Sequence, residues 1–119
     1  MKVCVIDDDP LMLQHIEAML VERGYQVVTA GNVSDGLARV REQRPEAVVV
    51  DILMPDRDGL NFIMGMRDLR DDVRIVAMTG GGRLGPGPLL RMAEGLGAHA
   101  SLTKPFSASE LEAALAATD

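Results

Sequence analysis

Short apolar runs alternate along the whole chain with longer segments that have helical periodicity. The runs lie at about residues 2–6, 26–30, 47–50, 73–78 and 99–103. This alternation is typical of a parallel sheet, because each parallel strand needs a long crossover, usually a helix, to reach the next one. We therefore predict an α/β fold: a doubly wound, five-stranded parallel sheet with five helices on its two faces.

The first two intervals carry clear signals for where a helix begins and ends. Asp9 followed by Pro10 is typical of a helix start, because Asp accepts a backbone hydrogen bond and Pro presets the first turn. Gly24 is expected to end this helix, since glycine readily adopts the left-handed conformation found there. A second helix is expected over residues 33–43, with Pro45 closing it.

The remaining helices are placed by similar signals. Asp58-Gly59 is expected to open the third, with Leu60, Ile63 and Met64 sharing one face. The fourth is predicted to run from about Pro86 or Pro88 to Gly95 or Gly97, and the fifth to begin at Ser107. The spacing of Ser107 and Glu110 predicts a capping box, in which the side chain of each residue accepts a hydrogen bond from the backbone amide of the other.

Polar residues stand at the carboxyl ends of four of the apolar runs. Asp7 and Asp8 follow the first, Asp51 follows the third, Thr79 ends the fourth and Lys104 follows the fifth. A buried strand gains nothing from a charge at its exit, because an unpaired buried carboxylate is costly. Since parallel strands end at one edge of the sheet, these side chains are predicted to form a single site.

This set of residues suits phosphoryl transfer. Three close carboxylates repel one another, so a proton or a cation has to lie among them, and hard oxygen ligands of this kind suit Mg²⁺. Lys104 supplies a positive charge and Thr79 a hydroxyl donor, which together with a metal neutralise and position a phosphoryl group. Asp51 is left as the nucleophile that would form an acyl phosphate.

Each of these residues also has a plainer interpretation. The acidic residues after the first run could cap the following helix, and we expect Asp9 mainly to do so. Asp51 could be a turn residue, Thr79 an ordinary strand end and Lys104 a solvated surface lysine. The placement of all of them at successive strand ends favours the shared site.

Composition narrows the class of protein. A chain of 119 residues is expected to form a single domain over residues 1–119 that needs no disulfide to fold. The net charge of −6 argues against direct binding of nucleic acid or an anionic membrane. Cys4 lies in an apolar run and is expected to be a buried structural thiol. No apolar stretch reaches the roughly 20 residues that span a bilayer, and we expect a cytoplasmic protein.

The polar residues and their neighbours resemble a known family. The motifs are Val5 to Pro10, Val50 to Pro55 with Asp58-Gly59, Met78-Thr79-Gly80, and Lys104-Pro105-Phe106. With these motifs in this order, the chain resembles the receiver domains of bacterial two-component response regulators. The resemblance implies a flavodoxin-like (βα)₅ fold with strand order 2-1-3-4-5. It also implies a signalling phosphoacceptor rather than an enzyme.

The resemblance implies a role for each acidic residue. Asp51 would accept a phosphoryl group from a phosphohistidine on a sensor histidine kinase or a histidine phosphotransfer protein. Asp7 and Asp8 would organise Mg²⁺, with Asp51 and the backbone carbonyl of Leu53 completing the protein ligands. The metal would be the protein's cofactor.

The resemblance also implies how the phosphoryl group would be read. Thr79 and Gly80 would bind and report it, and Lys104 would pair with one of its oxygens. The family usually places Tyr or Phe three residues before the lysine, where this chain has Ser101. We therefore hypothesise that ordering of the glycine-rich segment at residues 80–88 and of the fourth helix replaces an aromatic switch.

The expected output is a contact with a downstream protein through the face made by the fourth helix, fifth strand and fifth helix. We expect a monomer or a weak phosphorylation-dependent dimer, and an output that does not depend on a further domain of the same chain. Three alternatives stay open. One is a binding module that works without phosphorylation. A second is an aspartyl-phosphate hydrolase of the haloacid-dehalogenase type, which would need an acid where Leu53 stands. The third is a flavodoxin-like cofactor binder, which would need a phosphate-binding loop after the first strand.

Overall fold

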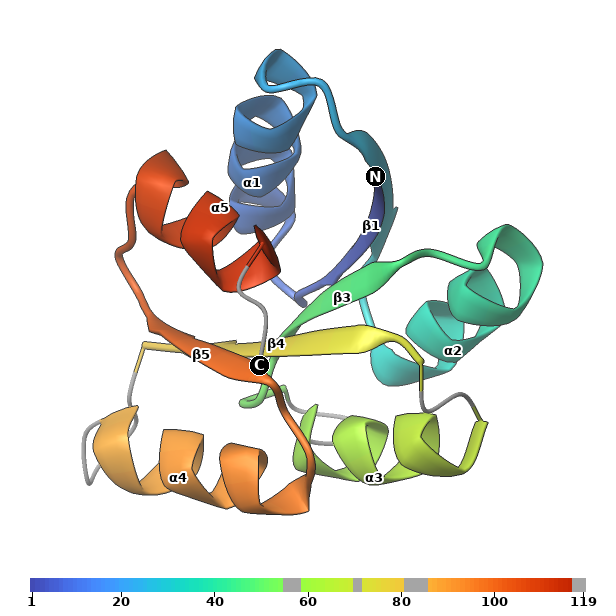
Figure 1. Ribbon diagram of the computed structural model, residues 1–119, viewed down its shortest axis with the longest axis vertical. Coiled ribbons are helices and arrows are strands. Elements are labelled where there is room, and N and C mark those ends of the chain that lie inside the picture. Colours follow the sequence, from blue (N-terminus) through green and yellow to red (C-terminus); the bar gives the residue numbers. More distant parts are fainter. Residues whose placement is uncertain (55–58, 70–71, 81–85, 117–119) are drawn as a thin grey trace.

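The computed structural model describes residues 1–54, 59–69, 72–80 and 86–116. A parallel sheet lies between two layers of helices (Figure 1). Its five strands follow the order β2-β1-β3-β4-β5. Their bounds are β1 Lys2–Ile6, β2 Gln26–Ala30, β3 Ala47–Asp51, β4 Arg74–Thr79 and β5 Ala100–Thr103. The fold class and strand order predicted from the sequence are confirmed.

Five helices connect and follow the strands. Their bounds are α1 Pro10–Glu22, α2 Val33–Gln43, α3 Gly59–Leu69, α4 Pro86–Leu96 and α5 Ala108–Ala116. Helices α1 and α5 lie on one face of the sheet, and α2, α3 and α4 lie on the other (Figure 1). The strands lie close to their predicted positions, although β3 includes Asp51 and β4 is shifted by one residue at each end.

Each face of the sheet has its own apolar core, because side chains of a strand alternate between the two faces. Ile16 and Leu20 of α1 pack with Leu111 of α5 over one face. Phe62 and Ile63 of α3 pack over the other face, in a cluster that also includes residues of α2 and α4. Both faces are covered, which is why the strands are almost continuously apolar.

One expectation about the core is wrong. Met64 was expected to share a face with Leu60 and Ile63, but 52% of its surface is exposed whereas Ile63 is fully buried. The inward face instead carries Phe62, Ile63 and Met66, which are all fully buried. The apolar residues of this helix run almost without interruption, so spacing alone did not reveal which of the methionines turns toward the sheet.

The predicted helix ends are confirmed. The Asp9 carboxylate accepts a hydrogen bond from the Leu11 amide at 3.0 Å. Gly24 has φ 91°, the left-handed conformation expected just after a helix. The Ser107 amide donates to Glu110 Oε1 at 2.9 Å, and the Glu110 amide donates to Ser107 Oγ at 3.0 Å. These two bonds are the capping box that the spacing predicts.

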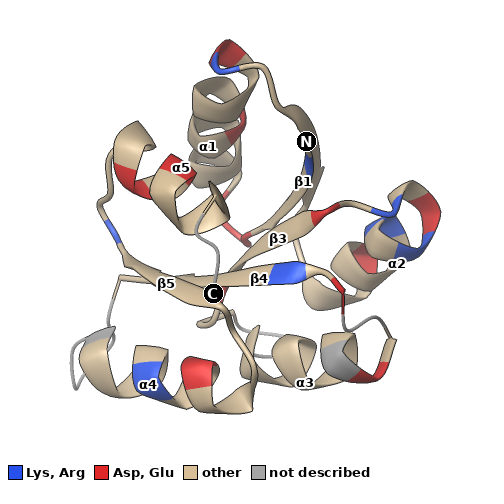
Figure 2. Ribbon diagram, viewed as in Figure 1, with Lys and Arg blue, Asp and Glu red and all other residues tan. Residues whose placement is uncertain are grey.

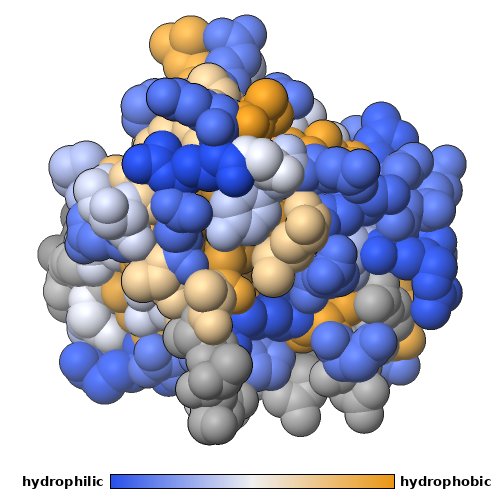
Figure 3. Space-filling model, turned by 45° about the horizontal axis from the view of Figure 1, so that its top comes forward, coloured by the Kyte–Doolittle hydropathy of each residue, from blue (hydrophilic) through white to orange (hydrophobic). Residues whose placement is uncertain are grey.

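Charged residues lie on the helices, on the connections and at strand ends (Figure 2). On the face seen in Figure 3, hydrophilic side chains surround smaller apolar patches. Cys4 is buried, as predicted, and burial raises the pKa of its thiol to about 12. Within the described part of the chain, no helix has the length and apolar character needed to cross a membrane.

His99 fixes the start of β4 next to β5. Its Nδ1 atom accepts a hydrogen bond from the Ile75 amide at 3.0 Å, while its own amide donates to the Ile75 carbonyl at 2.7 Å. Residue 99 therefore satisfies both backbone polar groups of Ile75, whose side chain is buried. The sequence did not reveal this role, because nothing local to His99 indicates the distant amide.

The His99→Ala substitution is expected to destabilise the fold. It removes the side-chain acceptor of the Ile75 amide, and the loss of a partly buried hydrogen bond costs about 0.5–1.5 kcal/mol. The free energy of unfolding in urea measures this cost. His15→Ala, at an exposed position of α1, is the matched control and should change stability by less than about 0.5 kcal/mol. Equal effects of the two substitutions would contradict the role of His99.

Candidate functional site at the carboxyl edge of the sheet

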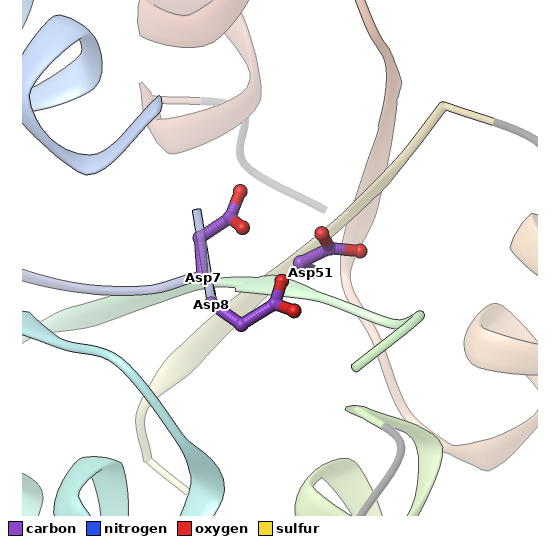
Figure 4. Close-up of side chains that lie close together, drawn as sticks. All are labelled: Asp7, Asp8 and Asp51. Carbon is purple, nitrogen blue, oxygen red and sulfur yellow. The ribbon is translucent and has the colours of Figure 1, made fainter. Parts of the chain in front are cut away.

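The acidic residues singled out from the sequence come together at the carboxyl ends of β1 and β3. Asp7 and Asp8 directly follow β1, and Asp51 is the last residue of β3 (Figure 4). One carboxylate oxygen from each lies within 4.8 Å of the others. Asp7 and Asp51 are buried, whereas Asp8 is exposed. The cluster is therefore open to solvent on the side of Asp8.

Backbone amides orient the two buried carboxylates in the same way. Asp7 Oδ1 accepts a hydrogen bond from the Asp9 amide at 2.9 Å, and Asp51 Oδ1 accepts one from the Leu53 amide at 2.9 Å. In both cases the donor lies two residues further along the chain, so a tight turn at each strand end fixes the carboxylate. The other oxygen of each group is left to bind something else.

Lys104 binds the second carboxylate oxygen of both Asp7 and Asp51. The Lys104 Nζ atom donates to Asp7 Oδ2 at 2.8 Å and to Asp51 Oδ2 at 2.9 Å. The Lys104 amide donates to the Thr79 carbonyl at 2.9 Å, which holds the end of β5 against the end of β4. The peptide bond between Lys104 and Pro105 is cis. Lys104 is thus a bridge between two strand ends and is not a solvated surface lysine.

Burial and hydrogen bonding shift the pKa values of Asp51 and Lys104. Burial raises the pKa of the Asp51 carboxyl, and the hydrogen bonds from the Leu53 amide and Lys104 offset only part of that rise. Burial alone would lower the pKa of Lys104, but its hydrogen bonds to Asp7 and Asp51 outweigh it and raise that pKa. Three acidic side chains gather around a single ammonium group, so the cluster favours a further cation.

The donor set fits Mg²⁺. Hard carboxylate oxygens are the ligands this ion prefers, and it usually binds one or two of them while keeping several waters. Asp8 offers an exposed carboxylate, and the carboxylates of Asp7 and Asp51 are already preoriented by backbone amides. The predicted carbonyl of Leu53 belongs to the residue whose amide orients Asp51.

The switch residues predicted from the sequence are in different surroundings. Thr79, the last residue of β4, is fully buried beside the site, and Gly80 follows it at an exposed position. Ser101 lies on β5, where its hydroxyl donates to Glu94 of α4 and not to the acidic cluster. Residues 81–85 of the glycine-rich segment lie outside the described residues, so the hypothesis about its ordering stays a prediction.

Gly59 packs against the site in a way that the sequence did not reveal. It was predicted as a helix start and as part of a family motif, and in the structure it lies directly on the backbone of the strand end that carries Asp51. A Cβ atom at position 59 would overlap the Asp51 carbonyl oxygen and lie 2.6 Å from the Ile52 Cα atom. The Gly59 amide also donates to the Ile52 carbonyl at 3.2 Å. Glycine here lets α3 approach the site closely.

Comparison with known proteins agrees with this geometry. Residues 3–116 match the response regulator receiver domain family. The chain belongs to this family. Its members are response regulators of two-component signalling, so the resemblance first indicated by the motifs is confirmed.

Three relatives illustrate the match. The acid tolerance regulatory protein ActR of Rhizobium meliloti is 33% identical over 93% of this chain and 56% of its own length. A receiver domain structure from Clostridium thermocellum is 31% identical with a TM-score of 0.84, covering 96% of this chain and 90% of that one. A response regulator structure from Burkholderia pseudomallei, with a phosphorylated aspartic acid and a calcium ion, is 30% identical with a TM-score of 0.86. The match covers 96% of this chain and 65% of that one.

The chain spans about half the length of the full-length regulators it matches, for example 56% of ActR and 49% of the probable C4-dicarboxylate response regulator DctR. The shared part is the receiver domain. What the remaining parts of those regulators do is a property of those proteins.

Gly59→Ala is expected to damage the site through its backbone. The added methyl group must displace the Asp51–Ile52 segment, and overpacking of this kind costs about 1–3 kcal/mol. Urea unfolding measures the loss, and amide shifts of residues 51–53 report the displacement. Gly65→Ala on the same helix is the control, because a Cβ atom there meets nothing within 4 Å. Unchanged amide shifts at residues 51–53 in Gly59→Ala would contradict the predicted backbone displacement.

Proposed function

We propose that this domain is a phosphoacceptor switch in which Asp51 receives a phosphoryl group from a histidine kinase or a histidine phosphotransfer protein. The observation that carries the proposal is the hydrogen bonding of Asp51. The Leu53 amide holds one of its oxygens, and Lys104 holds the other at 2.9 Å, beside two further acidic residues. A nucleophilic carboxylate is in this way fixed in direction and kept next to a cation.

The proposed Mg²⁺ ligands are the carboxylates of Asp7, Asp8 and Asp51 and the backbone carbonyl of Leu53. The ion supplies positive charge against the phosphoryl oxygens when it is bound. The chain's own part is to orient the Asp51 carboxylate through the Leu53 amide and to keep the Asp7 carboxylate fixed through the Asp9 amide. Asp8, the exposed member of the cluster, leaves room for a donor to approach.

In the proposed reaction the bond between phosphorus and the donor's nitrogen breaks, and a bond forms between phosphorus and an Asp51 carboxylate oxygen. The histidine departs with the electron pair of the broken bond. Lys104 then pairs with a phosphoryl oxygen, a short movement from its present position between two carboxylates. The hydroxyl of Thr79 and the amide of Gly80 are the further donors toward the phosphoryl group.

The proposed output is a shift of the face formed by α4, β5 and α5, which is read by a downstream protein. The proposed unit of function is residues 1–119 as a single receiver domain in the cytoplasm, monomeric or weakly dimeric when phosphorylated. It acts on no substrate other than its own phosphoryl group. The site's link to this face begins at Lys104, which follows β5 directly.

A second candidate is a receiver-like binding module that works without phosphorylation. The observation in its favour is Ser101, which stands where the family usually has an aromatic switch and instead binds Glu94. The hydrolase alternative lacks an acid at Leu53, and the cofactor-binding alternative would place phosphate against the acidic residues that follow β1.

Asp51→Asn decides between the switch and the binding module. With Mg²⁺ and acetyl phosphate, the wild-type chain should gain one phosphoryl group by intact mass, and the variant should gain none because an amide is not a nucleophile here. Glu46→Gln, an exposed position just before the same strand, should be phosphorylated like the wild type. An adduct on the Asp51→Asn variant would contradict Asp51 as the acceptor, whereas no adduct and no Mg²⁺-dependent amide shifts in the wild type would favour the second candidate.

Asp8→Asn tests the proposed metal ligands without any phosphodonor. Removing one carboxylate of the cluster should weaken Mg²⁺ binding by about tenfold or more, a loss of at least about 1.4 kcal/mol. Mg²⁺-dependent amide shifts around residues 7–9 and 51–53 give the dissociation constant. Asp9→Asn is the matched control, because it removes the same charge one residue away and keeps the helix cap. A similar loss in both variants would indicate general electrostatics and not coordination.

A further inference from the structure

A side-chain hydrogen bond joins α4 to β5 on the proposed output face. The hydroxyl of Ser101, the second residue of β5, donates to Glu94 Oε2 at 3.1 Å. Glu94 lies in the last turn of α4, seven residues before Ser101 in the chain. The bond therefore spans the turn that connects the helix to the strand.

Small buried residues lie next to both partners of this bond: Ala77 beside Ser101 in the sheet and Ala93 before Glu94 in α4. Ser101 is in register with Ala77 of β4, so both side chains point to the face that α4 covers. Ala77 of β4 and Ala93 of α4 are both fully buried on this face. Because Ser101 is small, its contact with α4 is the hydrogen bond to Glu94 and not the packing of a large side chain.

The position of Glu94 is unfavourable for the helix alone. A carboxylate in the last turn faces the negative end of the helix dipole, which costs about 0.3–1 kcal/mol at exposed positions. The last turn of α4, which the structure describes in full, has no basic residue that would balance this charge. The Ser101 hydroxyl donates to this exposed carboxylate, and the charge of the acceptor makes the bond stronger than a neutral one at the same exposure.

Further bonds fix the same end of α4. The amides of Gly97 and Ala98 both donate to the Ala93 carbonyl, at 3.1 Å and 3.0 Å, and Gly97 has φ 125°. His99 then pairs with Ile75 of β4, as described above. The carboxyl end of α4 is therefore tied to the sheet by its turn, by His99 and by the Ser101–Glu94 bond.

We propose that Ser101 and Glu94 form a clasp that holds the last turn of α4 against β5 and opposes displacement of α4 when Asp51 is phosphorylated. The second half of this inference rests on the proposed function. A bond made in the unphosphorylated arrangement favours that arrangement by its own free energy. Removing it therefore makes α4 easier to displace.

Hydrogen exchange on the unphosphorylated chain tests the clasp itself. Glu94→Ala and Ser101→Ala should each raise the exchange rates of the Gly97 and Ala98 amides by roughly three- to tenfold. In the double variant exchange should be no faster than in Ser101→Ala alone, because the bond is already lost and alanine at position 94 then only relieves the helix end. Additive effects would overturn the clasp.

The direction of the Glu94→Ala effect is decisive. If Glu94 were only a solvated carboxylate, alanine would strengthen the helix by its propensity and remove the dipole repulsion, so exchange would slow. Glu22→Ala is the matched control, since Glu22 is an exposed carboxylate at the last position of α1. It should leave exchange in the last turn of α1 unchanged or slower. Slower or unchanged exchange in Glu94→Ala would overturn the proposal.

Titration with beryllofluoride and Mg²⁺, which mimic the phosphoryl group, tests the regulatory half. In Ser101→Ala the amide shifts of residues 89–96 should reach their midpoint at a roughly two- to tenfold lower concentration than in the wild type. An unchanged midpoint would overturn the opposition to displacement. Absence of wild-type shifts around Asp51 would count against the proposed phosphoacceptor function, and the exchange rates would still decide whether the clasp exists.

Discussion

The bridge made by Lys104 is the interaction on which the site depends. Its ammonium group lies 2.8 Å from Asp7 and 2.9 Å from Asp51, so one cation joins groups from the ends of β1 and β3 to the end of β5. Without it, two buried carboxylates would face each other without compensation, which is among the most costly arrangements in a protein interior. The edge of the sheet is held together by the same charges that its chemistry uses.

This arrangement ties function to the fold. The carboxylates of Asp7 and Asp51 are oriented by amides of their own turns, whereas Lys104 follows β5, which is separated from β3 by β4. Any group that binds Asp51 has to compete with Lys104 or recruit it. Because the Lys104 amide also binds the Thr79 carbonyl, a change at Lys104 reaches the ends of β4 and β5 together. Ser101, which binds Glu94 of α4, lies on the same strand β5 three residues before Lys104.

Much of the fold and the site could be predicted from local patterns. Apolar runs marked the strands to within a residue or two, and Asp9, Gly24 and Ser107 marked helix ends, because capping involves residues only a few positions apart. Asp7, Asp8 and Asp51 could be assigned to one site because parallel strands end at one edge. Met64 was assigned to the wrong face, since the surrounding apolar residues do not specify which side of α3 meets the sheet.

The sequence by itself determined the order of elements, the fold class and the residues that gather at the carboxyl edge, because periodicity and strand ends are local properties. Only the tertiary structure decided the Lys104 bridge, the packing of Gly59 on the Asp51 backbone, the pairing of His99 with Ile75 and the Ser101–Glu94 bond. Each of these depends on the distance and direction between two elements, and those follow from how the helices pack on the sheet as a whole.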